Sequence, residues 1–156
     1  MKAATLSELK RELNELPPKQ VVELCLRLTR YKKENKELLT YLLFEADDEQ
    51  AYVNAIRQEI TDQFEMLNSS NIYLAKKGIR KILRMAGKFI KYSGNKQTEA
   101  EVLIHFCKEL KATGIRIHRY LDLSNLYDRQ LEKIRKAVAT LHEDLQWDYK
   151  GEIENL

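Results

Sequence analysis

The sequence predicts an all-α protein, and three observations support that prediction. Five Gly and two Pro among 156 residues leave few breaks, while Asp, Glu, Lys and Arg make up 33%, a balance typical of helical chains. Apolar residues recur at intervals of three and four, which is the period of a helix with one buried side. β-branched residues never alternate with polar ones over the length of a strand, so we expect almost no strand.

The N-terminal region is expected to form a helical hairpin. Thr5 and Glu8 have the spacing of a capping box, and leucines then recur at helical intervals as far as Leu16. Pro17 and Pro18 end this helix. Pro18 also suits the first turn of the next helix, because the N–H that proline lacks has no partner there anyway.

The next stretch is expected to bend and then to form two helices. A polar run interrupts the apolar pattern, and we place the bend near Asn35. Residues 38–44 are apolar nearly all round, which predicts a helix buried on several sides. Asp47 or Asp48 then caps a helix that runs to about Leu67, because carboxylates suit a helix N-terminus.

The stretch from Asn71 to Lys96 carries eight Lys or Arg and no Asp or Glu, whereas 1–70 sum to −3 and 97–156 to −2. A helix of roughly 22 residues here would be about 33 Å long. At 100° per residue its apolar side chains fall on one side and five cations lie opposite them. These five, named the basic stripe, are Lys77, Lys81, Arg84, Lys88 and Lys91.

Two further helices are expected towards the C-terminus. Thr98 and Glu101 have the spacing of a second capping box, which would open a helix from 98 to 113 that Gly114 ends. The last helix has the most regular apolar period of the chain, and this period runs on to Leu145.

The chain length predicts a single domain over 1–147, followed by a polar, frayed tail at 148–156. Successive helices would pair as hairpins of about 35 to 40 residues, the size of a helical repeat, although no residue-level repeat is evident. The predicted architecture is an irregular stack of helical hairpins, HEAT-like or bundle-like, with six to eight helices.

Two stretches, ELKRELNELPPKQVVELCLRL near the start and LAKKGIRKILRMAGKFIKYS in the middle, resemble a small all-helical bacterial family of unknown function. The resemblance implies the same order of elements over most of the chain. It implies no catalytic residue and no ligand, and it does not extend to 32–46 or to the residues after Trp147.

No catalytic, cofactor-binding or metal-binding motif is evident. His105, His118 and His142 stand in no ExxH or HExxH arrangement, and neither GxSxG nor a glycine-rich phosphate loop is present. Cys25 and Cys107 each lie in an apolar stripe, so we expect two reduced, buried thiols of a cytoplasmic protein. We expect no enzyme, no metal and no cofactor.

No uncharged apolar stretch approaches 18 residues, so no membrane span is expected. The two glycines inside the basic stretch, Gly78 and Gly87, are expected to let another helix approach closely.

The basic stripe suggests two functions. The first is a non-enzymatic helical scaffold or adaptor that binds an acidic protein or another polyanion through the basic helix face. The alternative is a nucleic-acid-binding protein that uses the basic stretch at 76–96. An enzyme with carboxylate and Arg groups is a third possibility, which a pocket joining a cation, His118 and a buried carboxylate would favour.

A purely structural explanation of the stripe also stands. The acidic segment 45–65 could pack as an antiparallel neighbour, with Glu59, Asp62 and Glu65 neutralising Lys76, Arg80 and Lys81. Exposed pairs of this kind contribute only about 0 to 1 kcal/mol each, so they would not by themselves account for a helix with eight bases and no acid.

Overall fold

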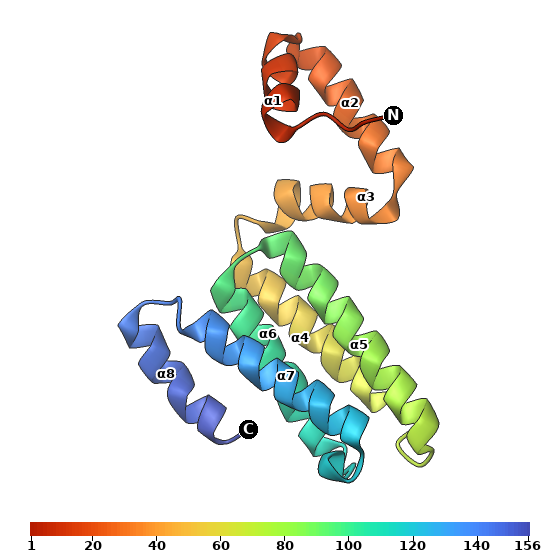
Figure 1. The fold of residues 1–156 in the computed structure, drawn as a ribbon, viewed down its shortest axis with the longest axis vertical. Coiled ribbons are helices and arrows are strands. Elements are labelled where there is room, and N and C mark those ends of the chain that lie inside the picture. The colour runs from red at the N-terminus through yellow and green to blue at the C-terminus, as the bar shows by residue number, and fades with distance from the viewer. The chain divides into compact units, whose positions relative to one another are not determined.

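The computed structural model describes residues 1–156 and confirms the all-α fold, with eight α-helices, two short helical turns and no strand (Figure 1). The chain divides into two compact units: the N-terminal unit, Met1–Phe44, and the C-terminal unit, Glu45–Leu156. The single domain expected over 1–147 is therefore not what forms. All buried apolar side chains except Tyr41 belong to the C-terminal unit, so the first 44 residues build almost no core of their own. None of the helices is both long enough and apolar enough to cross a membrane.

The N-terminal unit contains three helices and most of a short π-helical turn. They are α1 (Leu6–Glu15), α2 (Pro18–Tyr31), α3 (Lys33–Thr40) and η1 (Tyr41–Glu45). The capping box of α1 is confirmed: the Thr5 N–H donates to a Glu8 carboxylate oxygen at 2.7 Å, and the Glu8 N–H donates to the Thr5 hydroxyl oxygen at 3.3 Å. Pro18 opens α2 as expected. The bend falls at Lys32, between α2 and α3, and the Asn35 side-chain amide donates across it to the Leu28 carbonyl at 2.8 Å.

Residues 38–44 do not form the buried helix that their composition predicts. Leu42, Leu43 and Phe44 are 55%, 62% and 78% exposed, and none of α1, α2 and α3 contains a buried residue. The physical reason is size, because a unit of this length has too much surface for its volume to enclose an apolar core.

The C-terminal unit is built around a helix other than the basic one. Its helices are α4 (Glu49–Glu65), α5 (Ile72–Ser93), α6 (Lys96–Ala112), α7 (Leu121–Val138) and α8 (Glu143–Glu154), with a 3₁₀ turn, η2 (Ile117–Arg119), before α7. The central helix is α6, which packs against α4, α5 and α7, while α8 packs on the outer side of α7 (Figure 1). The apolar side chains of α6 that are buried are Ala100, Val102, Leu103, Ile104, Phe106, Cys107 and Leu110.

Most helix ends follow the expected capping rules. Asp48 caps α4 and Asn71 caps α5, each through its side-chain oxygen. Gly94 after α5 and Gly114 after α6 adopt positive φ angles of 66° and 73°, a conformation that costs other residues a steric clash. The predicted capping box at Thr98 is wrong. Asn95 caps α6 instead and accepts from the backbone N–H groups of two residues, so the helix begins two residues earlier.

The C-terminal end of the chain differs most from expectation. The helix predicted to continue to Leu145 stops at Val138, and residues 143–154 form the separate helix α8 where a frayed tail was expected from 148. No Gly or Pro marks the break, and apolar residues keep a helical spacing across it. Tyr149 secures α8, because it is 7% exposed and its hydroxyl donates to Glu101 of α6 at 2.7 Å.

Candidate functional site

The basic stripe lies along the solvent side of α5. Lys77, Lys81, Arg84 and Lys91 are exposed, and Lys88 is half-buried with its ammonium nitrogen 5.0 Å from the centroid of the Phe89 ring. None of the four exposed cations forms an ion pair. Helix α5 buries Ala75, Ile79, Ile82 and Ala86 on the opposite side, so packing on α4 and α6 holds the cations towards solvent.

Two further bases of α5 are neutralised, by a single carboxylate of α7. The Lys76 ammonium lies 2.8 Å and the Arg80 guanidinium 2.6 Å from the two oxygens of Asp122. The hydrogen bond from Lys76, assisted by Arg80, lowers the pKa of Asp122 below its usual value. Asp122 stands in the first turn of α7, so this contact places the start of α7 beside the first half of α5.

The acidic segment before α5 does not neutralise the four exposed cations of the basic stripe. Glu59 accepts a hydrogen bond from Gln63 at 2.6 Å, and Asp62 accepts one from Gln58 at 2.8 Å, both within α4. No ion pair joins α4 to the exposed cations of α5, and Lys81 in particular has no acidic partner. For these four cations the purely structural explanation therefore fails, and Lys76 and Arg80, which it also covers, are paired with Asp122 instead.

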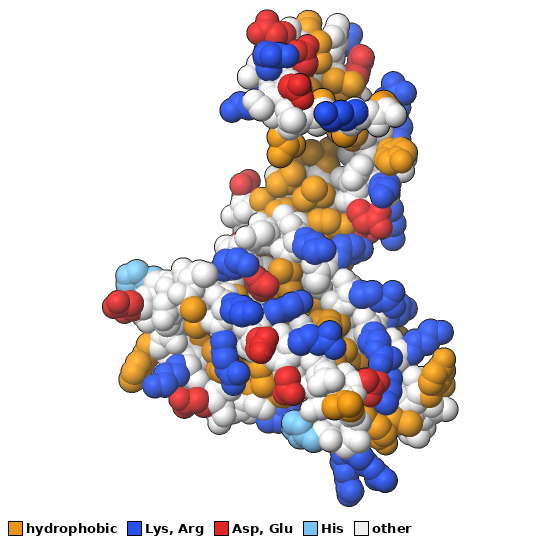
Figure 2. All heavy atoms as spheres, viewed as in Figure 1, with side chains coloured by type: hydrophobic (Ala, Val, Ile, Leu, Met, Phe, Trp, Pro, Cys, Tyr) orange, Lys and Arg blue, Asp and Glu red, His pale blue; other side chains and the backbone are white.

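A second row of cations lies on α7 and was not singled out from the sequence. Arg129, Lys133 and Lys136 follow Asp122 by 7, 11 and 14 positions, so at 100° per residue all three fall within about 40° of its direction. All are exposed and none forms an ion pair. Because Asp122 contacts Lys76 and Arg80, these three residues, named the α7 row, lie on the side of α7 that Asp122 turns towards α5. Figure 2 shows Lys and Arg side chains gathered over α5 and α7.

The spacing of the α7 row was visible in the sequence, but its meaning was not. Intervals of four and three between cations are common on solvated helices, and acids such as Asp128 and Glu132 stand between them. Only the Asp122 contact shows that this row, and not the acids, lies on the side that adjoins α5.

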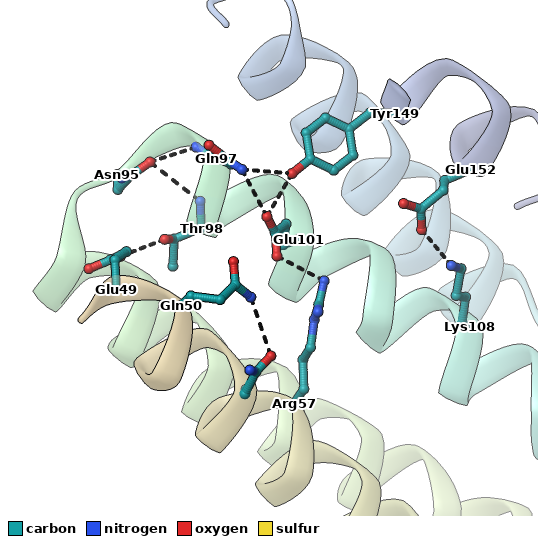
Figure 3. Close-up of polar contacts among 11 residues, drawn as sticks. Glu49, Gln50, Arg57, Asn95, Gln97, Thr98, Glu101, Lys108, Tyr149 and Glu152 are labelled. Carbon is teal, nitrogen blue, oxygen red and sulfur yellow. Dashed lines mark hydrogen bonds and ion pairs between the residues drawn. The ribbon is translucent and has the colours of Figure 1, made fainter. Parts of the chain in front are cut away.

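A buried polar cluster joins α4, α6 and α8 away from the cations (Figure 3). Glu101 is 7% exposed, and one of its oxygens accepts from Arg57 at 2.9 Å. The other oxygen accepts from Tyr149 at 2.7 Å and from Gln97 at 3.1 Å. Burial and the hydrogen bond to this carboxylate raise the pKa of Tyr149 to about 12. Each oxygen of Glu101 accepts at least one hydrogen bond, so the cluster links the three helices to one another.

His105 continues this polar side of α6. Its Nε2 lies 2.9 Å from the Thr61 hydroxyl and 3.6 Å from a Glu109 oxygen. Burial lowers the pKa of His105. Sequence reasoning passed over Glu101 and Glu109 here, although they stand four residues on either side of His105 and therefore share its face.

The residues that an enzyme on this scaffold would have needed together lie apart. His118 in η2 contacts Ser124 at 3.4 Å and the Tyr127 ring edge-on, whereas the buried carboxylate Glu101 lies among α4, α6 and α8. No three His, Cys, Asp or Glu side chains gather where they could hold a metal ion. A shallow hollow of about 730 Å³ lies between α7 and α8, with Trp147 and Leu131 in its lining.

The two cysteines have opposite environments. Cys107 is fully buried in α6, and burial raises the pKa of its thiol to about 12. Cys25 is exposed on α2, so its expected burial is wrong. Its helix does carry the expected apolar stripe, but none of the residues of this helix is buried.

Comparison of the chain with family models, with curated proteins and with solved structures finds no match. What the basic stripe does must therefore be inferred from its geometry.

Proposed function

We propose that this protein is a non-enzymatic helical adaptor that uses the face formed by the basic stripe and the α7 row to hold an acidic segment of another protein. The observation that supports this is the state of the stripe: four exposed cations along one helix, with no acid among them and no ion pair to any of them.

Repulsion between like charges lowers the stability of α5, and a bound polyanion would offset this loss. Lys77 and Lys81, both exposed, are four residues apart, and like charges at this spacing destabilise a helix by about 0.2 to 0.5 kcal/mol per pair. A helix selected for stability alone would carry acids at some of these positions. An acidic partner removes the repulsion and gains attraction from every cation it touches.

The α7 row adds to the positive electrostatic potential of the basic stripe. Three further exposed cations lie on the side of α7 that Asp122 turns towards α5, and Asp122 itself is already occupied by Lys76 and Arg80. Clustered charge of one sign raises the association rate of an oppositely charged partner, and added salt weakens the effect.

Duplex nucleic acid is the second candidate, and one observation favours it. The 22 residues of α5 extend about 33 Å, close to the roughly 34 Å of one turn of the double helix. Four phosphate contacts along that length would give a slope of log affinity against log salt of about −3 to −4.

The test compares an acidic and a nucleic-acid probe with a matched pair of variants. Binding of the full chain to poly-glutamate and to a mixed-sequence duplex of about 20 base pairs is measured across a salt series. The test variant is Arg84→Glu with Lys91→Glu. The control, with the same change in charge, is Lys19→Glu with Lys36→Glu, at two exposed lysines of the N-terminal unit that form no ion pair.

Binding of poly-glutamate that the test variant loses and the control keeps would support the adaptor. Binding of the duplex with the steep slope, and little binding of poly-glutamate, would favour the second candidate. If neither probe binds the parent at low salt, or if both variants lose the same amount of affinity, the face is not a polyanion site.

A further inference from the structure

The exposed apolar surface of this chain is concentrated in the N-terminal unit. Of the 18 large apolar side chains that are exposed, 13 belong to the first 44 of 156 residues. Isolated exposed leucines need no explanation, but a contiguous apolar patch marks an interaction site.

The patch has the spacing of a helical bundle. In α1 and the residue after it, apolar positions fall at intervals of 3, 4 and 3, and α2 repeats the same intervals. The first series is Leu6, Leu9, Leu13 and Leu16, and the second is Val21, Leu24, Leu28 and Tyr31. Two heptads of this kind on each helix make a seam that fits between other helices, yet Leu28 is 61% and Tyr31 78% exposed.

The short connection turns the chain back on itself. Only Leu16 and Pro17 separate α1 from α2, and so short a connection folds the two helices into a hairpin (Figure 1). A hairpin with a heptad seam on both helices is half of a four-helix bundle. The missing half is another hairpin of the same pattern.

The charges of the hairpin favour a copy of itself as the missing half. Helix α1 carries three acids and two bases, whereas α2 carries one acid and three bases. In a two-fold arrangement with α1 of one chain against α2 of the other, the net charges of facing helices are opposite at both contacts. A uniformly basic hairpin would instead have suited an anionic lipid surface.

The available area is compatible with a dimer. Six of the seam side chains are exposed, and with on the order of 100 Å² of apolar surface on each they offer about 600 Å², most of the about 800 Å² that a standard interface takes from each partner. We infer that the α1–α2 hairpins of two chains associate as a two-fold four-helix bundle, making this protein a homodimer.

The dimer is independent of the proposed function, because it requires no cation of α5 or α7. If both hold, each dimer carries two basic faces, and a partner with two acidic segments would gain avidity from binding both.

The experiment measures the mass of the full chain and the reactivity of one native thiol. Cys25 lies in the α2 seam, next to Leu24, and is exposed in the single chain, whereas Cys107 is buried and serves as an unreactive reference. Sedimentation equilibrium under reducing conditions from about 1 to 100 µM should show the shift from 18.4 kDa to twice that mass. Labelling of Cys25 should slow over the same range while Cys107 stays unlabelled.

A matched pair of variants tests whether the seam is the interface. Leu28→Glu places a charge in the seam, at a side chain that no core needs, and should leave the chain monomeric with rapid labelling of Cys25 at every concentration. Leu121→Glu makes the same change at a leucine of α7 that is 77% exposed, and should keep the dimer.

Three results would overturn the inference. A monomeric parent with rapidly labelled Cys25 would mean that the seam stays open. A monomeric parent with slow labelling would mean that another part of the same chain covers the seam. A dimer that survives Leu28→Glu would place the contact on a different surface.

Discussion

At the residue scale, the polar cluster around Glu101 is a feature whose contacts predict an effect on stability. A buried carboxylate is tolerated only when donors surround it, and here Arg57, Gln97 and Tyr149 supply them from three different helices. The cluster therefore joins segments that lie far apart in the sequence. Removal of one donor should lower the stability of the whole C-terminal unit.

The variant Tyr149→Phe tests this. It keeps the ring but removes the donor to Glu101, so the free energy of unfolding should fall by about 1 to 3 kcal/mol. Urea unfolding measures the change. The control Tyr73→Phe alters a tyrosine that is 74% exposed and should change stability by less than about 0.5 kcal/mol. Equal losses in the two variants would mean that the Glu101 contact contributes nothing.

His105 predicts a pH dependence of stability. Because its pKa in the folded state lies below the ordinary 6.5, the unfolded chain takes up this proton first as the pH falls. The contribution of His105 is therefore complete well above pH 6.5 and is lost progressively as the pH falls towards the folded-state value. His105→Gln should reduce the loss of melting temperature between about pH 7.5 and pH 5. An unchanged loss in the variant would assign the pH dependence to other groups.

At the element scale, the two glycines of α5 have different reasons to be glycine. A Cβ on Gly78 would collide with the side chain of Leu67, a residue of the turn after α4, so this glycine makes room for a side chain and not for another helix. A Cβ on Gly87 would meet nothing within 4 Å, so the expected close approach of another helix is wrong there too.

The pair gives a matched test of helix propensity against packing. Gly87→Ala should stabilise the protein by about 0.5 to 1 kcal/mol, because alanine loses less backbone freedom on folding and nothing obstructs its methyl group. Gly78→Ala should gain less or destabilise, since Leu67 must move. Thermal unfolding measures the stability of both variants. An equal gain in stability in both would contradict the packing role of Gly78.

At the scale of the whole molecule, the distribution of buried side chains separates the two units. Nearly all buried apolar side chains lie in the C-terminal unit, so residues 45–156 contain what their own fold needs. A fragment of residues 45–156 should be helical by circular dichroism and unfold cooperatively, within a few degrees of the corresponding transition in the full chain. A fragment without cooperative unfolding would show that the core depends on the first 44 residues.

Local chemistry made part of this molecule predictable. The all-α class, the Thr5 capping box, the opening of α2 at Pro18, the cap of α4 and the end of α6 at Gly114 depend on neighbouring residues, and all were predicted from the sequence. The basic stripe was predictable for the same reason, because the face of a helix on which a residue lies follows from 100° per residue.

Tertiary packing decided the rest. Apolar spacing predicts which side of a helix could be buried but not whether another element covers it. The burial of Cys25 and of residues 38–44 was therefore wrongly expected. The break at Val138 and the docking of α8 depend on Tyr149 reaching Glu101, a contact between residues 48 apart in the chain. The side of α7 that the α7 row occupies is likewise known only from Asp122 reaching Lys76 and Arg80 of α5. The sequence by itself determined which helices form and where their charges lie, because those are short-range properties. Only the tertiary structure decided which faces are covered, because coverage depends on contacts between distant residues.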